Sequence, residues 1–95
     1  MKTATKWDAS EYLETEEDMA AYLNAALEDG DTSVIAAALG DIARAKGMTQ
    51  LSKETGITRD GLYKALSPTG NPSFDTVQKV IKAFGLKLDV TQCRL

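Results

Sequence analysis

The sequence predicts an all-α domain, a bundle of about five helices with a short β-strand at its C-terminal end. Three observations lead to this fold class. Apolar residues recur at helical spacing in several separate stretches of the 95-residue chain. Ser, Thr or Asp stands before most of these stretches and Gly stands after most of them, as expected for helix caps. Only residues 86–91 switch to an alternation with period two, which is typical of a half-buried strand.

The length allows one domain, and we expect an N-terminal arm over residues 1–14 followed by a single helical domain over residues 15–95. No apolar run approaches the roughly 20 residues needed to cross a bilayer. The N-terminus lacks the apolar stretch of a secretory signal. The single cysteine, Cys93, has no partner for an internal disulfide. We therefore expect a cytoplasmic protein that does not act at a membrane.

The arm ends in a short stretch, residues 7–13, that is rich in large apolar groups. Two interpretations are open for its side chains. They either seal one side of the small core or form a hydrophobic anchor that binds another protein. The residues concerned are Trp7, Tyr12 and Leu13.

Two helices follow the arm. Thr15 is the expected N-cap of the first, with Asp18 in the position of a capping box. The inner stripe of this helix is Met19, Tyr22, Leu23, Ala26 and Leu27. Asp31 caps the second helix, which runs to Gly47. Small residues in that helix, Gly40 among them, permit the close approach of another helix, within the domain or across a dimer.

Residues 48–66 form the central motif of the chain. Two short helical runs meet at a turn, where Gly56 ends the first in the left-handed conformation and Thr58 caps the second. In the second run, Leu62 and Leu66 lie on one side of the helical wheel. The opposite side carries the polar residues Arg59, Asp60, Tyr63 and Lys64. This pattern predicts a helix-turn-helix, although any two amphipathic helices joined by a glycine turn share part of it.

The polar side of the second run suits base edges and phosphates. Arg59 and Lys64 can donate to guanine or phosphate, and Tyr63 can contact a sugar or a thymine methyl group. Asp60 can accept from cytosine or restrain Arg59. Candidate contacts to the DNA backbone are Thr49, Gln50, Lys53 and Asn71. Because one small domain makes few base contacts, we expect a homodimer on a palindromic operator.

A last helix begins at the N-cap Ser73 and stops at Gly85. Its expected apolar face is Phe74, Val77, Val80, Ile81 and Phe84. The predicted strand over residues 86–91 comes next. A strand needs a partner for its backbone groups, and the candidates are residues 3–7 or the same strand of a second copy.

Charge divides the chain into two parts. Residues 1–41 carry ten carboxylates against Lys2 and Lys6, a net −8, whereas residues 42–95 carry nine Lys or Arg against four carboxylates, a net +5. The overall charge is −3. The asymmetry indicates two surfaces with different partners, one polyanionic and one basic, or simply a solvated acidic face.

An enzyme is not expected, and neither is a cofactor or a metal. The chain has no histidine, no cluster of metal ligands, no glycine-rich phosphate loop and no nucleophile beside a base.

Residues 47–88 resemble the C-terminal part of the prophage-type addiction module antidote proteins, which carry a Xre/lambda-repressor-like helix-turn-helix. The most specific blocks are residues 62–67, LYKALS, and 70–74, GNPSF. Upstream, the pairs Tyr12-Leu13 and Gly30-Asp31 also match. The resemblance extends from about Trp7 to Leu88, and it implies a lambda-repressor-like fold.

The resemblance also implies a function, that of the antitoxin of a type II toxin–antitoxin module. Such a protein binds operator DNA as an autorepressor and neutralises a small basic toxin of the RelE/ParE-like class. The implied DNA-reading positions are Thr58, Arg59, Asp60, Tyr63 and Lys64. Two alternatives stay open: a protein-only inhibitor or interaction module whose helix-turn-helix is structural, and a prophage transcriptional repressor without a toxin partner.

Overall fold

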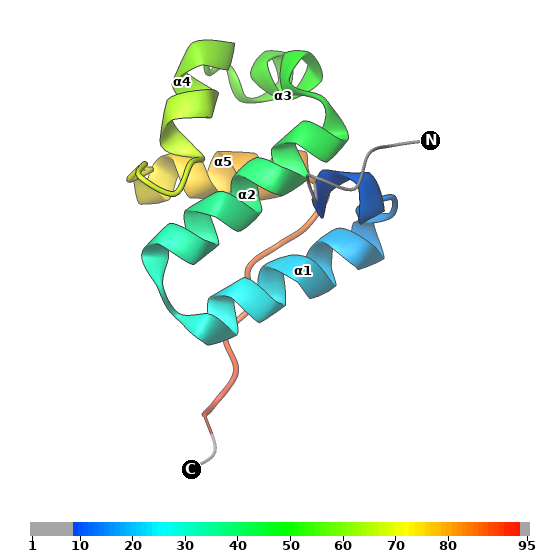
Figure 1. The fold of residues 1–95 in the computed structure, drawn as a ribbon, viewed down its shortest axis with the longest axis vertical. Coiled ribbons are helices and arrows are strands. Elements are labelled where there is room, and N and C mark those ends of the chain that lie inside the picture. The colour runs from blue at the N-terminus through cyan, green and yellow to red at the C-terminus, as the bar shows by residue number, and fades with distance from the viewer. Residues whose placement is uncertain (1–8, 94–95) are drawn as a thin grey trace, which may run out of the picture.

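The computed structural model describes residues 9–93, and this part of the chain is all-helical (Figure 1). Within residues 9–93, a 3-10 turn, η1, precedes five α-helices, which confirms the prediction of an all-α bundle of about five helices. The elements are η1 (Ala9–Tyr12), α1 (Glu16–Asp29), α2 (Thr32–Lys46), α3 (Met48–Thr55), α4 (Arg59–Ala65) and α5 (Phe74–Ala83).

The helices are arranged around α2. Helices α1 and α2 form an antiparallel pair, and the short helices α3 and α4 lie beyond the C-terminal half of α2 (Figure 1). Helix α5 passes behind α2 in the same view and contacts α3. None of the helices in the described residues is long and apolar enough to cross a membrane.

The expected helix caps are confirmed. The Thr15 hydroxyl accepts from the Asp18 amide at 3.0 Å and the Asp18 carboxylate accepts from the Thr15 amide at 3.2 Å, which completes the capping box. At the start of α2, Asp31 accepts from the hydroxyl of Ser33 at 2.8 Å and from its amide at 2.9 Å. These two hydrogen bonds lower the pKa of Asp31 from its usual value, and the bond from the Ser33 hydroxyl has the larger effect.

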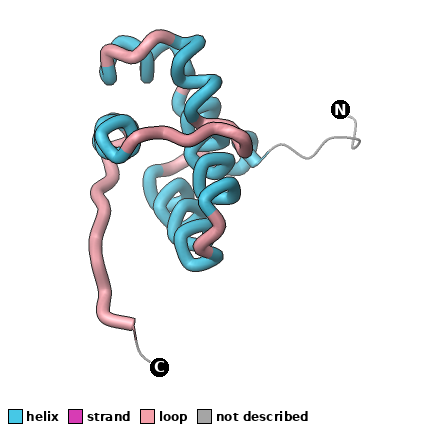
Figure 2. Tube along the Cα trace, turned by 90° about the vertical axis from the view of Figure 1, so that its left-hand side faces the viewer, coloured by secondary structure: helices cyan, strands magenta, loops and turns pink. Residues whose placement is uncertain are grey.

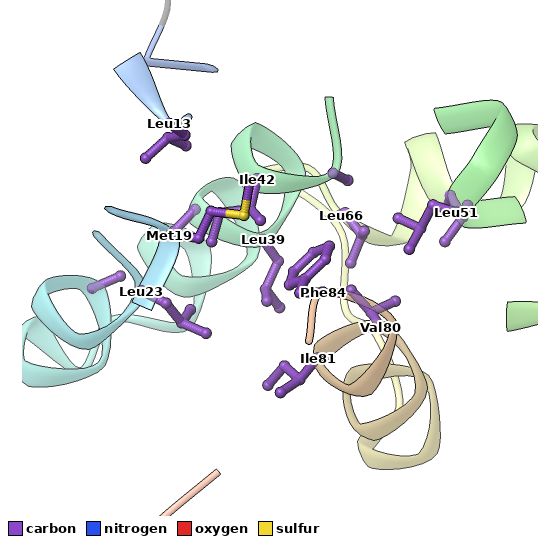
Figure 3. Packing of buried hydrophobic residues seen from close by; sticks show 14 of the residues in the cluster. Leu13, Met19, Leu23, Leu39, Ile42, Leu51, Leu66, Val80, Ile81 and Phe84 are labelled. Carbon is purple, nitrogen blue, oxygen red and sulfur yellow. The ribbon is translucent and has the colours of Figure 1, made fainter. Parts of the chain in front are cut away.

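One hydrophobic core joins all five helices. The ring of Phe84 lies in the middle, with Leu39, Leu66 and Val80 around it (Figure 3). The largest side chains with essentially no exposed surface come from α2, α3, α4 and the end of α5: Phe84, Leu39, Ile42, Leu51, Leu62 and Val80. Each helix is therefore held mainly by its buried apolar face.

The predicted C-terminal strand is wrong. Residues 86–93 are extended but form no strand, and they run away from α5 along one side of the molecule (Figure 2). The neighbour of this tail is helix α1, since Ala20, Leu23 and Leu27 line a shared hollow with Leu86 and Leu88. A helix has no free edge for pairing. Leu86 packs against the core, whereas Leu88 is 36% exposed and Val90 is 93% exposed, so the alternation does not correspond to one buried face. Residues 3–7, one expected partner, lie outside the described residues.

Two large apolar side chains expected on inner faces are exposed instead. Phe74 is 69% exposed because it is the first residue of α5 and lies beyond the core. Leu27 is 40% exposed, near the end of α1 on the flank that faces the C-terminal tail. Helical spacing predicts the direction of a side chain but not how far its neighbours extend.

Candidate nucleic-acid interface

The turn between α3 and α4 is held by hydrogen bonds on both sides. Gly56 has φ 77°, and its amide donates to the Ser52 carbonyl at 2.9 Å. The Ser52 hydroxyl donates across the turn to the Ile57 carbonyl at 2.5 Å. Thr58 is extended, and its hydroxyl accepts from the Gly61 amide at 3.0 Å. The start of α4 is thereby fixed relative to α3.

Gly61, inside α4, makes room for this turn. A Cβ at Gly61 would lie 3.1 Å from the Thr58 hydroxyl oxygen and 3.3 Å from Cγ2 of Ile57. A glycine costs about 1 kcal/mol relative to alanine in a helix interior. At Gly61 the absence of a Cβ lets Thr58, the N-cap, and Ile57, the apolar residue of the turn, lie this close to the helix.

The other end of α4 rests against α2. A Cβ at Gly40 would lie only 2.2 Å from the Leu66 carbonyl oxygen, so α2 can meet the end of α4 only where it carries a glycine. The close approach expected at Gly40 therefore occurs within the domain. Leu62 and Leu66, which are 0% and 4% exposed, pin the inner side of α4 to the core.

With its inner side buried, α4 presents four polar side chains to solvent. We call Arg59, Asp60, Tyr63 and Lys64 the α4 patch; all four are exposed. Lys64 Nζ lies 3.8 Å from Asp60 Oδ2, and both side chains are at least 80% exposed. An ion pair so open to water contributes little to stability. Asp60 thus pairs with Lys64 along the helix, whereas a restraint on Arg59 was one of the two roles expected for Asp60.

The remaining candidate DNA contacts flank α4. Thr49, Gln50 and Lys53 are exposed on α3, and Gln50 Nε2 donates to Glu54 Oε2 at 2.9 Å. Asn71 is exposed in the loop after α4. This loop folds back onto the helix end, where the Ser67 hydroxyl donates to the Lys64 carbonyl at 3.1 Å. The predicted positions are therefore carried by α3, α4 and the following loop.

Sequence reasoning missed two features of this region. One is the hydrogen bond between Gln50 and Glu54, although side chains four residues apart on a helix lie close enough to meet. The other is Gly70, where a Cβ would lie 2.3 Å from the Ala65 carbonyl oxygen and 2.4 Å from that of Lys64. Gly70 allows the loop to pack against the last turn of α4.

The three apolar residues of the N-terminal stretch have different positions. Leu13 is 7% exposed and belongs to the core, as the simpler interpretation expected. Tyr12 is 62% exposed at the end of η1, which contacts α2. Trp7 lies outside the described residues. Burial of Leu13 removes it from the candidate partner anchor.

Chemically, the region offers hydrogen-bond donors and one aromatic ring on a rigid support. Arg59 and Lys64 suit guanine edges and phosphates, and Tyr63, at 48% exposure, offers its ring to a sugar or a methyl group. Within residues 9–93, the side chains of His, Cys, Asp and Glu form no group that could hold a metal ion.

Comparison with known proteins identifies the family. A family model described as "probable addiction module antidote protein" matches residues 3–92. A protein from Haemophilus influenzae, described as uncharacterized, is 51% identical over 88 residues, which cover 93% of this chain and 91% of that protein. No solved structure matches the chain. Since the family model spans nearly the whole sequence, the chain belongs to the family of probable addiction module antidote proteins.

Proposed function

We propose that the protein is the antitoxin of a type II toxin–antitoxin module. It binds operator DNA through α3 and α4 as an autorepressor, and it silences a small basic toxin of the RelE/ParE-like class in the cytoplasm. The observation that carries the DNA-binding part is the α4 patch, held outward by the burial of Leu62. Membership of the antidote family supports the toxin partner.

In this proposal α3 and α4 form a helix-turn-helix, with α4 as the helix that enters the major groove. Arg59 is the first residue of α4, and residues near the N-terminus of a recognition helix are the ones that reach base edges. Lys64 lies more than one turn later and contacts phosphate. Thr49, Gln50 and Lys53 on α3, with Asn71 in the loop, set the position on the DNA backbone.

The acidic net charge does not oppose DNA binding. The negative charge is concentrated in residues 1–41, which include η1, α1 and most of α2, whereas residues 42–95 are net positive. The α4 patch belongs to the positive part. A homodimer would present two such patches to the half-sites of a palindromic operator, which adds the base contacts that one copy lacks.

A protein-only inhibitor is the second candidate, and one observation favours it. The ion pair between Asp60 and Lys64 places a carboxylate on the same helix face as the proposed phosphate contact. In such a protein α3 and α4 would have only a structural role. DNA-binding measurements separate the two candidates.

Arg59→Ala and Lys64→Ala are each expected to weaken binding to the DNA upstream of the protein's own gene. Loss of a bidentate base contact by Arg59 corresponds to a decrease in affinity of about 5- to 150-fold. Loss of a phosphate contact by Lys64 lowers the slope of log affinity against log salt by about 1. Fluorescence anisotropy with a labelled duplex over a range of salt concentrations measures both effects.

The matched control is Lys82→Ala, which removes the same charge from an exposed site on α5, beside the C-terminal tail. It should leave affinity nearly unchanged. Absence of binding by the unmodified protein at low salt, or binding that is indifferent to both α4 substitutions, would leave the protein-only inhibitor as the better description.

A further inference from the structure

A groove of about 410 Å³ runs between α1 and α2, away from the α4 patch. Its walls are largely alanine and valine, and its residues include Tyr22, Ala25 and Asp29 from α1 and Val34, Ala37 and Ala38 from α2. Val34 is 41% exposed. At one end the Tyr22 hydroxyl donates to the Asp41 carboxylate at 2.5 Å, which ties α1 to α2 there. The groove is a shallow apolar depression, and the hydrogen bond between Tyr22 and Asp41 fixes its shape at one end.

The surroundings of the groove are acidic. Residues 9–46, which form η1, α1 and α2, carry nine Asp or Glu against Arg44 and Lys46. Arg44 is itself bound to Asp41. Asp29 lies in the groove lining, and Glu28 and Asp31 are exposed close to it in the chain. A partner for this surface therefore needs an apolar side chain flanked by Lys or Arg, so that its potential complements that of the groove.

A second copy of the chain fits the groove poorly. A two-fold dimer brings the same patch of each subunit together, and here it would place Asp29 and its acidic neighbours opposite their own copies. Like charges that face each other across an interface disfavour association. A contact between the groove and the basic half of another copy would be head-to-tail and would not close into a dimer.

The groove and the α4 patch lie at different ends of the molecule. Helices α1 and α4 are separated by α2, with α4 beyond its C-terminal half (Figure 1). A protein seated on α1 and α2 would leave the α4 patch open to DNA. Both partners can therefore bind one copy at the same time.

From the shape and charge of this surface we infer that the α1–α2 groove is the docking site for a basic protein partner. This inference rests on the proposed function, because the partner that an antitoxin of this kind requires is its toxin. The apolar side chain of the partner enters between Ala25 and Ala37, and its basic side chains face Asp29 and the surrounding carboxylates.

Two matched pairs of substitutions test the groove. Ala25→Leu fills it with a good helix former, whereas Ala21→Leu adds the same bulk at an exposed position on α1 outside the groove lining. Asp29→Lys reverses a charge in the lining, and Glu28→Lys makes the same change one residue away, also outside the lining. Lysine at either position suits the C-terminal end of α1, so neither change opposes the helix dipole.

Each variant is co-expressed with the product of the reading frame adjacent to the gene, and affinity is measured by calorimetry on the purified proteins. We expect Ala25→Leu and Asp29→Lys to weaken the complex at least about tenfold, and their controls to change it by less than about threefold. Circular dichroism and operator binding report on the fold, and all four variants should keep both.

The outcomes distinguish the groove from the proposed function. A complex that all four variants form equally well would overturn the groove assignment and leave the antitoxin role standing. Asp29→Lys and Glu28→Lys could instead weaken the complex equally while Ala25→Leu has no effect. This result would indicate general electrostatic attraction between the two proteins, and it would also overturn the groove assignment. Failure of the unmodified protein to form a complex would overturn both the groove assignment and the antitoxin role. A change from dimer to monomer in Ala25→Leu, measured by light scattering, would assign the groove to a second copy instead.

Discussion

Leu62→Ala is expected to lower the free energy of unfolding by about 2–5 kcal/mol. The Leu62 side chain is 0% exposed and is the only side chain of α4 itself that is fully buried among the described residues. Its removal leaves a cavity between α4 and the rest of the core. Because small domains are stable by only about 5–15 kcal/mol, a large share of the total stability would be lost. Urea unfolding followed by circular dichroism measures the change.

The same substitution should weaken operator binding even at low temperature, where most molecules are folded, because α4 then lacks the contact that fixes its orientation. Leu27→Ala is the control, since Leu27 is also a helical leucine but is 40% exposed. It should cost less than about 1 kcal/mol, in the range of substitutions away from the core. A loss of stability in Leu62→Ala no greater than in this control would show that α4 is not anchored as described.

Gly40→Ala is expected to destabilise the protein, against the ordinary preference of helices. Alanine is favoured over glycine by about 1 kcal/mol in a helix interior. At Gly40, however, the added Cβ would lie 2.2 Å from the Leu66 carbonyl oxygen, and a backbone atom can move aside only if α4 or α2 moves. Overpacking of this kind costs about 1–3 kcal/mol. The substitution should also displace the end of α4 that carries Lys64, and this displacement should weaken operator binding.

The sign of the stability change makes this experiment decisive. Ala37→Gly, at a partly exposed position of the same helix, reports the intrinsic difference between the two residues and should destabilise by about 1 kcal/mol. If Gly40→Ala instead stabilises the protein by a similar amount, the close contact between α2 and α4 is absent. Thermal and urea unfolding of both variants, together with anisotropy for Gly40→Ala, provide the comparison.

The elements of this fold that depend on local chemistry were predictable. Thr15, Asp31, Thr58 and Ser73 each cap the helix that was expected to follow, because an N-cap hydrogen bond spans only two or three residues. The outward direction of the α4 patch followed from the spacing of Leu62 within its helix. The role of that patch in binding DNA stays a prediction.

The elements that depend on distant neighbours were predicted less well. The alternation in residues 86–91 indicated a strand, but the tail lies beside α1, which has no edge with which to pair. Phe74 has the spacing of a core residue, yet it lies beyond the end of the core. In both cases the local pattern indicated a buried face that the neighbouring elements among residues 9–93 do not cover.

The positions at which helices begin and end, and the side chains that face out from α4, follow from the order of residues, because caps and helical periodicity act within a few positions. The contact of Gly40 with the Leu66 carbonyl, the burial of Leu13 in the core and the groove between α1 and α2 became known from the three-dimensional fold. These features depend on how helices far apart in the chain approach one another, and that approach is set by the packing of the whole core.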